Sequence, residues 1–227
     1  MRRFATPLAL LLGSTLLFSL VQADDQDKRA ASREKAAGFV ALFNGKNLEG
    51  WIGSTKGYVA EKGVLACLPK GGGNLLSARQ YSDFILRFEF KLPPGGNNGL
   101  AIRTPASGNP AYAGMELQIL DNTAKRFARL KSYQYHGSIY GVVPAQRGHL
   151  KPVGEWNSQE VIVRGTYIRV ILNGAPIVNA NIDGLGSLDG RKHPGLKRDK
   201  GHIGFMGHGA RVEFRNIRIK DLAAAAR

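Results

Sequence analysis

Glu116 and Gln118 alternate with apolar residues in the segment 115–120. In a β-strand, successive side chains point to opposite faces, so the two polar groups would share one face while the apolar groups pack into the core. Arg103 closes an earlier apolar segment. If the two segments are antiparallel neighbours, Arg103, Glu116 and Gln118 gather on one surface, with Asp121 at its rim. Carboxylate, amide and guanidinium groups gathered in this way can move a proton and stabilise a developing negative charge.

The same residues also have a purely structural interpretation. Opposite charges on neighbouring strands stabilise a solvated sheet, and polar residues commonly cover the exposed face of an antiparallel sheet. The alternation alone therefore leaves both a functional site and a cross-strand charge pair open.

The rest of the chain predicts an all-β domain that would position these segments. Short apolar runs punctuated by Gly, Asn and Pro begin at Gly38 and continue almost to the C-terminus. Asn173-Gly174 and Glu61-Lys62-Gly63 each separate two such runs and are typical of hairpin turns. Many Gly turns and little helix indicate a sandwich or a barrel. We expect strands at 39–43, 57–60, 64–68, 74–77, 84–92, 99–104, 115–120, 160–164, 168–172, 175–178, 202–206 and 212–220.

Three long connections interrupt this rhythm, at 122–138, 141–155 and 179–200. The first two, with Tyr140 between them, are rich in basic residues, tyrosine and histidine. Loops of this length in a compact domain are usually functional or mobile.

The two ends of the chain differ from the predicted domain at 38–222. The first 23 residues resemble an export signal, with Arg2 and Arg3, an apolar run from Leu8 to Leu20, and Val21-Gln22-Ala23 in a small-x-small pattern. We expect cleavage after Ala23 and a secreted or periplasmic protein without a membrane span. Residues 24–37 are charged and Ala-rich, which predicts a flexible leader or a short exposed helix, and 223–227 are expected to fray.

The chain is strongly basic, with a formal net charge of +15 at pH 7 that falls by two when Arg2 and Arg3 are removed. Such a charge favours weak association with polyanions through the basic loops. A specific nucleic-acid reader would add aromatic platforms or a recognition helix, and neither is evident. The single cysteine, Cys67, excludes an internal disulfide, and its apolar neighbours predict a buried structural thiol.

Several longer motifs stand in order along the domain. They are GFVALFNGKNLEGW at 38–51, YSDFILRFEFKL at 81–92, GGNNGLAIR at 95–103, GMELQILD at 114–121, HGSIYG at 136–141, GEWN at 154–157 and GHIGFMGHGARVEFRNIRIK at 201–220. In this order they resemble the 3-keto-disaccharide hydrolase domain family over nearly all of 38–222.

The resemblance implies a two-sheet jelly-roll β-sandwich of the concanavalin A-like lectin and glucanase type. It also implies a 3-keto-glycoside hydrolase or lyase, whose substrates are oxidised to a ketone at C3 of the sugar. The ketone acidifies the C2 hydrogen, so a base can remove it, the group at C1 leaves by elimination, and water adds back. Such a site needs a base, donors to the enolate oxygen and an acid for the leaving group.

For this chemistry we assign Glu116 as the base and Arg103 as an oxyanion donor, with Asn98 or Gln118 as further donors. His136 or Asp121 would protonate the departing oxygen. We expect the remaining substrate contacts from side chains in or near the motifs, which are Glu89, Asn98, Gln118, Tyr140, Trp156, Asn157 and His208. Trp51 is expected to pack in the core rather than to bind sugar.

Two positions depart from the family pattern. Asn98 stands where a serine is common, and Met206 stands where a glutamine is common, which removes a polar group near His208. A non-catalytic carbohydrate-binding module on the same sandwich is therefore the alternative to an enzyme, and a polyanion-binding protein is a third interpretation.

The sequence shows no compact metal motif and no evident cofactor site. His-x-His, paired-cysteine and Asp-x-Asp-x-Asp spacings do not occur. A divalent site assembled from distant residues, for example Glu116, Asp121, His136 and His208, stays open.

Overall fold

The computed structural model describes residue 29 and residues 32–223. The predicted export signal lies outside these residues, as do 224–227. The chain divides into two compact units, Met1–Phe39 and Val40–Arg227. In the first unit residues 32–36 are helical. In the described part of the chain, no helix combines the length and the apolar character that a membrane span requires.

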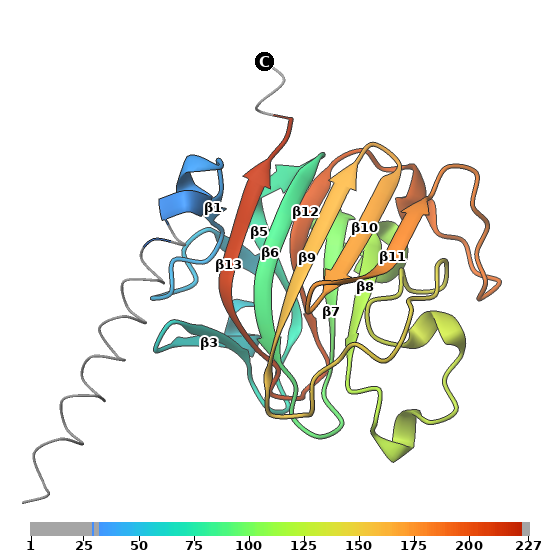
Figure 1. Ribbon diagram of the computed structural model, residues 1–227, viewed down its shortest axis with the longest axis horizontal. Coiled ribbons are helices and arrows are strands. Elements are labelled where there is room, and N and C mark those ends of the chain that lie inside the picture. Colours follow the sequence, from blue (N-terminus) through green and yellow to red (C-terminus); the bar gives the residue numbers. More distant parts are fainter. Residues whose placement is uncertain (1–28, 30–31, 224–227) are drawn as a thin grey trace, which may run out of the picture. The chain divides into compact units, whose positions relative to one another are not determined.

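Two antiparallel sheets make up the second unit, which confirms the predicted all-β sandwich (Figure 1). The strands are β1 Val40–Ala41, β2 Trp51–Gly53, β3 Tyr58–Glu61, β4 Val64–Cys67, β5 Gly73–Tyr81, β6 Phe84–Lys91, β7 Asn97–Thr104, β8 Met115–Leu120, β9 Trp156–Arg164, β10 Tyr167–Leu172, β11 Ala175–Asn181, β12 Gly201–Gly207 and β13 Glu213–Asp221. The eight-stranded sheet has the order β11-β10-β9-β6-β13-β4-β3, with β1 paired to β13, and the five-stranded sheet has the order β2-β5-β12-β7-β8. Short β2 is the strand that the sequence pattern did not predict.

Both predicted hairpins close with two-residue turns. Lys62 and Gly63 join β3 to β4 with φ values of 49° and 80°, and Asn173 and Gly174 join β10 to β11 with φ values of 50° and 87°. Positive φ at both central residues gives a turn whose twist matches that of the flanking strands, which explains the Gly at the second position.

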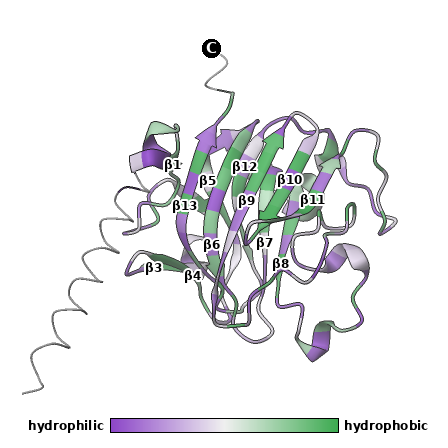
Figure 2. Cartoon of the chain, viewed as in Figure 1, coloured by the Kyte–Doolittle hydropathy of each residue, from purple (hydrophilic) through white to green (hydrophobic). Residues whose placement is uncertain are grey.

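The two sheets bury one apolar cluster between their inner faces. At its centre, the ring centroids of Phe205 and Phe214 lie 3.8 Å apart, and Trp51 stacks on Phe205 at 6.0 Å. Trp51 therefore packs in the core as expected, and Cys67 is fully buried, which confirms the structural thiol. Figure 2 shows the alternation of hydrophobic and hydrophilic positions along β6 and β13 that this packing requires.

Irregular segments connect the strands on either side of β8. The short helix α2 (Pro110–Ala113) joins β7 to β8, and the β8–β9 connection contains the 3-10 helices η2 (Lys125–Phe127) and η3 (Ser132–Gln134). The β11–β12 connection contains η4 (Pro194–Lys197), while η1 (Thr55–Gly57) precedes β3. The three long connections predicted from the sequence are thus present, and two of them contribute to the site.

Candidate active site

Glu116 ends a row of small and apolar residues on the outer face of the five-stranded sheet. Strand pairing places Ala101 of β7 opposite Glu116 of β8. Gly204 of β12 pairs with Ala101 on one side and with Leu76 of β5 on the other. The predicted alternation holds in β8, because Met115, Leu117 and Ile119 belong to the core between the sheets.

The Glu116 carboxyl is buried without a compensating partner. The residue is 5% exposed, and among the described residues none donates a hydrogen bond to its carboxylate. Burial raises the pKa of the Glu116 carboxyl to about 7, because the charged form loses hydration that no described residue replaces with a hydrogen bond. A carboxyl that titrates near neutral pH can both take up and return a proton under physiological conditions.

Gly99 provides the space that the Glu116 side chain occupies. A Cβ built on Gly99 would lie 2.2 Å from Oε1 of Glu116. The φ angle of Gly99 is not in the left-handed region, so the requirement for glycine here is one of space. Gly99 of the GGNNGLAIR motif therefore leaves room for the Glu116 carboxylate.

The segment 137–143 runs along the free edge of β8 and carries Tyr140 to the site. The amide of Gly137 donates to the Gln118 carbonyl at 2.7 Å, and the amide of Tyr140 donates to the Glu116 carbonyl at 2.9 Å. The Tyr140 hydroxyl accepts a hydrogen bond from Nε2 of Gln134 at 2.9 Å. This edge pairing makes Tyr140 a neighbour of Glu116.

Gln118 lies on the same face of β8 as Glu116, opposite Gly99. It is 6% exposed, and its Oε1 accepts a hydrogen bond from the Ile119 amide at 3.0 Å. Because the oxygen is used in this way, the amide nitrogen is the end of the side chain that is left to donate. Gln118 thus remains a predicted donor to a substrate oxygen.

Tyr112 of α2 lies over the same sheet face. It packs against a small apolar cluster separate from the main core, made of Leu76, Ala101, Ala111 and Met206. Nη1 of Arg191 donates to the Tyr112 hydroxyl at 2.8 Å, and the guanidinium carbon lies 5.3 Å from the ring centroid. Since Ala101 is the cross-strand partner of Glu116, Tyr112 and Glu116 border the same patch of the sheet.

A hydrogen-bonded pair of side chains, His193 and Asp189, supports Tyr112 from the β11–β12 connection. Nε2 of His193 lies 3.0 and 3.1 Å from the two carboxylate oxygens of Asp189, with side-chain exposures of 3% and 9%. Burial alone would raise the pKa of Asp189, but hydrogen bonds from the Arg191 amide and His193 lower it overall. The His193 ring meets the Tyr112 ring edge-on, with centroids 4.9 Å apart.

The sequence analysis did not single out Tyr112, Asp189, Arg191 or His193 as site residues. Their meeting depends on how the 182–200 connection folds back, which strand periodicity does not predict. One local signal was present for α2, because Asn109 followed by Pro110 is typical of a helix start. Asn109 does cap this helix, accepting a hydrogen bond from the Ala111 amide.

Arg103 does not stand beside Glu116 as expected. The residue has a φ of 48°, which ends the strand alternation. Its guanidinium donates to the Ser82 carbonyl at 3.0 and 3.1 Å, to the Arg198 carbonyl at 3.2 Å and to Asp83 at 3.1 Å. Arg103 lines a cavity of about 890 Å³, bordered also by Arg191 and His193.

His136 is a core residue, contrary to the role of leaving-group acid. It is 2% exposed, its ring stacks on Phe90 with centroids 5.0 Å apart, and its Nε2 lies 3.1 Å from Oε1 of Gln159. Nδ1 accepts from the Leu120 amide, so the ring is neutral with the proton on Nε2. Burial lowers the pKa of His136 to about 3, so near neutral pH the ring is not in the imidazolium form that could act as an acid.

Asp121 and Asn98 have structural partners as well. Asp121 accepts from the Gly95 amide at 2.7 Å and from both the amide and hydroxyl of Thr123. Burial alone would raise the pKa of Asp121, but these hydrogen bonds lower it overall. A carboxyl with a lowered pKa is ionised near neutral pH and is a poor acid. Asn98 is fully buried, and its Oδ1 accepts from the amides of Gly99 and Met206, so it braces two strands rather than facing a ligand.

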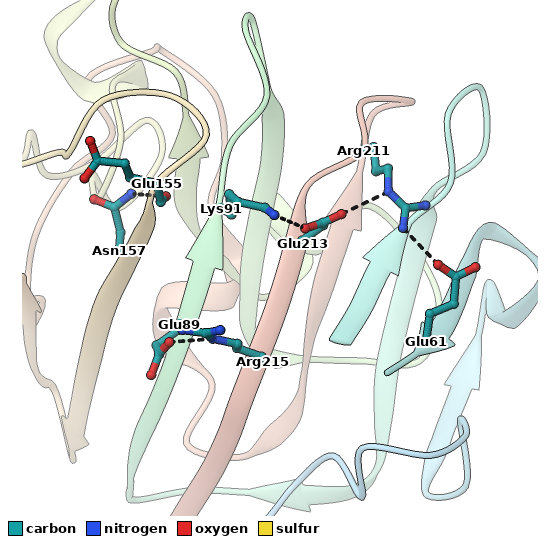
Figure 3. Close-up of polar contacts among 8 residues, drawn as sticks. All are labelled: Glu61, Glu89, Lys91, Glu155, Asn157, Arg211, Glu213 and Arg215. Atoms are coloured by element: carbon teal, nitrogen blue, oxygen red, sulfur yellow. Dashed lines mark hydrogen bonds and ion pairs between the residues drawn. The ribbon is translucent and has the colours of Figure 1, made fainter. Parts of the chain in front are cut away.

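Three predicted sugar contacts lie in the eight-stranded sheet instead. Glu89 pairs with Arg215 at 2.7 Å (Figure 3). It also accepts a hydrogen bond from Asn216 at 2.8 Å. Trp156 lies between two cations, with Lys91 at 4.9 Å and Arg215 at 4.1 Å from its ring centroid. Strand alternation correctly placed Glu89 and Trp156 on an outward face. That face belongs to the eight-stranded sheet, whereas Glu116 lies on the five-stranded sheet.

Asn157, the third of these residues, is 1% exposed and acts as a loop brace. Its Oδ1 accepts from the Lys151 amide and from Asn173, each at 2.9 Å, and its Nδ2 donates to the Glu155 carbonyl. All its polar atoms are therefore used within the protein.

A metal site built from Glu116, Asp121, His136 and His208 is not formed. Within 29 and 32–223, no group of three or more His, Cys, Asp or Glu side chains could hold a metal ion. His136 is in the core while Glu116 is on the outer face of its sheet, so the two cannot share an ion. His208 follows β12 and is exposed, and its contact with substrate stays a prediction.

Comparison with known proteins places this geometry in context. Residues 38–220 match the model of the 3-keto-alpha-glucoside-1,2-lyase-like domain. A curated relative from Bacteroides thetaiotaomicron, a 3-keto-disaccharide hydrolase, is 28% identical over 82% of this chain and 79% of its own length. The matched range agrees with the resemblance inferred from the sequence motifs.

Two crystal structures of proposed glycosyl hydrolases from Parabacteroides distasonis are also similar. One has a TM-score of 0.72 and 29% identity, covering 81% of this chain and 99% of its own. The other has a TM-score of 0.72 and 26% identity, covering 84% of this chain and 96% of its own. Together these relatives support a carbohydrate-active hydrolase on a β-sandwich.

Proposed function

Because the chain belongs to the 3-keto-alpha-glucoside-1,2-lyase-like domain family, we propose that it cleaves 3-keto-glycosides and that Glu116 is the base that removes the C2 hydrogen. One observation carries the proposal. Glu116 is a buried carboxyl without a hydrogen-bond donor among the described residues, with a pKa of about 7, on a face walled by Tyr112 and Tyr140.

The reaction begins with transfer of the C2 hydrogen to the Glu116 carboxylate. The electrons of the C2–H bond form the enolate of the C3 ketone, and in this proposal the Gln118 amide donates to a substrate oxygen. The enolate then forms a C1=C2 double bond as the C1–O bond breaks. Water adds as a hydroxyl group to C1, its second proton balances the proton that the departing oxygen takes up, and Glu116 returns its proton to C2, which completes a net hydrolysis.

The electrostatics of Glu116 favour this route over that of a two-carboxylate glycosidase. Those enzymes hold two carboxyl groups a few ångströms apart across the scissile bond. The raised pKa of Glu116 has burial as its cause, without a contribution from a neighbouring acid. A solitary carboxyl suits proton abstraction next to a ketone.

Activity is expected to depend on pH through Glu116. The base must be ionised, so kcat/KM should rise with pH and level off above about 7. A steady-state pH profile on a 3-keto-disaccharide measures this limb. An acidic limb near the ordinary carboxyl pKa would contradict the assignment.

The test of the function compares a 3-keto-disaccharide with the same disaccharide that has not been oxidised. Products are identified by mass spectrometry, with a chelator-treated sample in parallel. We expect release of a 3-keto-monosaccharide from the oxidised substrate alone. Cleavage of both substrates would overturn the proposal, and saturable sugar binding without turnover would favour a binding module. Loss of activity with chelator would add a metal to the reaction.

We also propose that the protein acts outside the cytoplasm, on the basis of the signal-like residues 1–23. N-terminal sequencing of the protein from a periplasmic or culture-medium fraction should begin at Asp24. Recovery of the full-length chain from the cytoplasm would contradict this. Weak association with polyanions stays a prediction.

A further inference from the structure

The elimination step needs a proton for the departing oxygen at C1, and the structure removes both acids that the sequence had offered. His136 is buried in the core between the sheets, and Asp121 is a turn residue with a lowered pKa. An alkoxide is a poor leaving group, so protonation by a positioned side chain contributes about 10²- to 10⁴-fold to such a step. The acid must come from the walls around Glu116.

Two tyrosines border the sheet face that carries Glu116: Tyr112, which packs against the Ala101 cluster, and Tyr140, whose amide pairs with the Glu116 carbonyl. The Tyr112 hydroxyl accepts from the guanidinium of Arg191, while the Tyr140 hydroxyl accepts from the neutral amide of Gln134. In each case the hydroxyl oxygen is the acceptor, so its own proton is free to be donated outward. A cationic donor stabilises the phenolate left after proton transfer, and a neutral amide does so less.

We infer that Tyr112 is the general acid that protonates the leaving oxygen, with Arg191 stabilising its phenolate and the His193–Asp189 pair positioning the ring. This inference rests on the proposed function. Tyr112 would touch the reacting atoms and is a catalytic residue, whereas His193 and Asp189 act through it and are positioning residues.

The environment of Tyr112 keeps its hydroxyl protonated before the reaction, as a general acid requires. Burial raises the pKa of the Tyr112 hydroxyl, and Arg191 opposes part of this rise. The hydroxyl is therefore protonated at neutral pH. As the C1–O bond breaks, the O–H proton of Tyr112 moves to the departing oxygen, and the phenolate forms beside the Arg191 cation.

The second half of the reaction restores both groups. Water gives its oxygen to C1 and a proton to the Tyr112 phenolate, while the proton on Glu116 returns to C2. Both protons are accounted for, and no oxidant or reductant is required. Each residue ends in its starting state.

The experiment uses Tyr112→Phe in the full-length protein, with Tyr133→Phe as the matched control. Tyr133 is a nearby loop tyrosine that contacts Tyr140 edge-on, with ring centroids 6.4 Å apart. Two substrates are compared, a 3-keto-disaccharide and a 3-keto-glucoside with a nitrophenol at C1. The nitrophenolate leaves without protonation, whereas the sugar alkoxide does not.

We expect Tyr112→Phe to lower kcat on the disaccharide by about 10²-fold or more and to change kcat on the nitrophenyl substrate by less than about threefold. Tyr133→Phe should leave both rates unchanged. Arg191→Gln should show a smaller loss with the same dependence on the leaving group. Circular dichroism and thermal unfolding of each variant establish that the fold is retained.

Other outcomes separate this inference from the proposed function. Equal losses on both substrates, or a leaving-group-dependent loss in Tyr140→Phe instead, would overturn the role of Tyr112. In those cases turnover by the unaltered protein would still support the C2 elimination. If the unaltered protein turned over neither 3-keto substrate, the proposed function itself would fail.

Discussion

The outer faces of the two sheets differ in how their carboxylates are partnered. On the eight-stranded sheet the carboxylates are paired. Lys91 and Arg211 lie 2.7 and 3.0 Å from Glu213, and Arg215 lies 2.7 Å from Glu89 (Figure 3). On the five-stranded sheet, Glu116 is buried beside Gly99 and Ala101, and within the part of the chain that the structure describes it has no such partner. Glu116, a carboxyl without an ion-pair partner among the described residues and shielded from water, is therefore the one available for chemistry.

The largest expected effect separates Glu116 from Glu89. Glu116→Gln should lower kcat on a 3-keto-disaccharide by about 10²- to 10⁴-fold, because the neutral amide cannot accept the C2 proton. Glu89→Gln alters a surface ion pair on the other sheet and should keep kcat within about twofold. Steady-state kinetics on both variants make the comparison. Similar rates for the two variants would mean that the sheet faces do not differ in function.

Stability should change in the opposite direction from activity in Glu116→Gln. A carboxyl whose pKa rises from 4.5 to about 7 on folding binds its proton more tightly in the folded state. The folded state therefore loses stability as pH rises through this range, and at about pH 9 the cost is about 3 kcal/mol. Denaturant unfolding should show Glu116→Gln more stable than the unaltered protein at about pH 9 and equal to it at about pH 4. A variant that is less stable at high pH would indicate a hidden partner for the carboxylate.

Gly99→Ala tests whether the position of the carboxylate matters. The added Cβ would lie 2.2 Å from Oε1 of Glu116, so the flexible end of that side chain must move. We expect kcat to fall by about tenfold or more, since displacement of a catalytic group by an ångström is costly. Another glycine such as Gly50 does not offer a matched control, because its φ of 82° would strain an alanine for a reason unrelated to space. Thermal unfolding should change little, and an unchanged kcat would remove Gly99 from the account.

The smallest effect is expected from the charged network on the eight-stranded sheet. Glu213→Gln removes ion pairs to Lys91 and Arg211, whose side chains are 32% and 37% exposed. Partly exposed pairs contribute at most about 1 kcal/mol and are screened by salt. The loss in the free energy of unfolding should therefore shrink at high salt. A larger loss that is independent of salt would show that this face is more than a solvated surface.

Strand periodicity and turn residues were sufficient to predict an all-β sandwich or barrel, the two hairpins and the placement of Glu116 on a face opposite the core, while the family resemblance selected the sandwich. These features depend on neighbours in the chain or on the two-residue period of a strand. The same reasoning placed Glu89 and Trp156 in the site, because alternation identifies an outward position without indicating which sheet it belongs to.

The remaining errors have local physical causes. Arg103 turns away from Glu116 because its backbone leaves the extended region at the end of β7, and His136 enters the core because the segment after η3 packs inward. Tyr112, Arg191 and His193 meet through a connection of about twenty residues without regular strands. Their contacts depend on tertiary packing that no sequence period encodes.

The most direct test of the central claim follows hydrogen at C2. A 3-keto-disaccharide with deuterium at C2 is turned over in ordinary water, with a sample lacking the protein as control for spontaneous exchange. If Glu116 removes this hydrogen, cleavage should show a primary isotope effect, and ordinary hydrogen should appear at C2 to the extent that the Glu116 carboxyl exchanges with water before it returns a proton. Product that keeps its deuterium and forms at the rate of the unlabelled substrate would contradict elimination and point to direct displacement at C1.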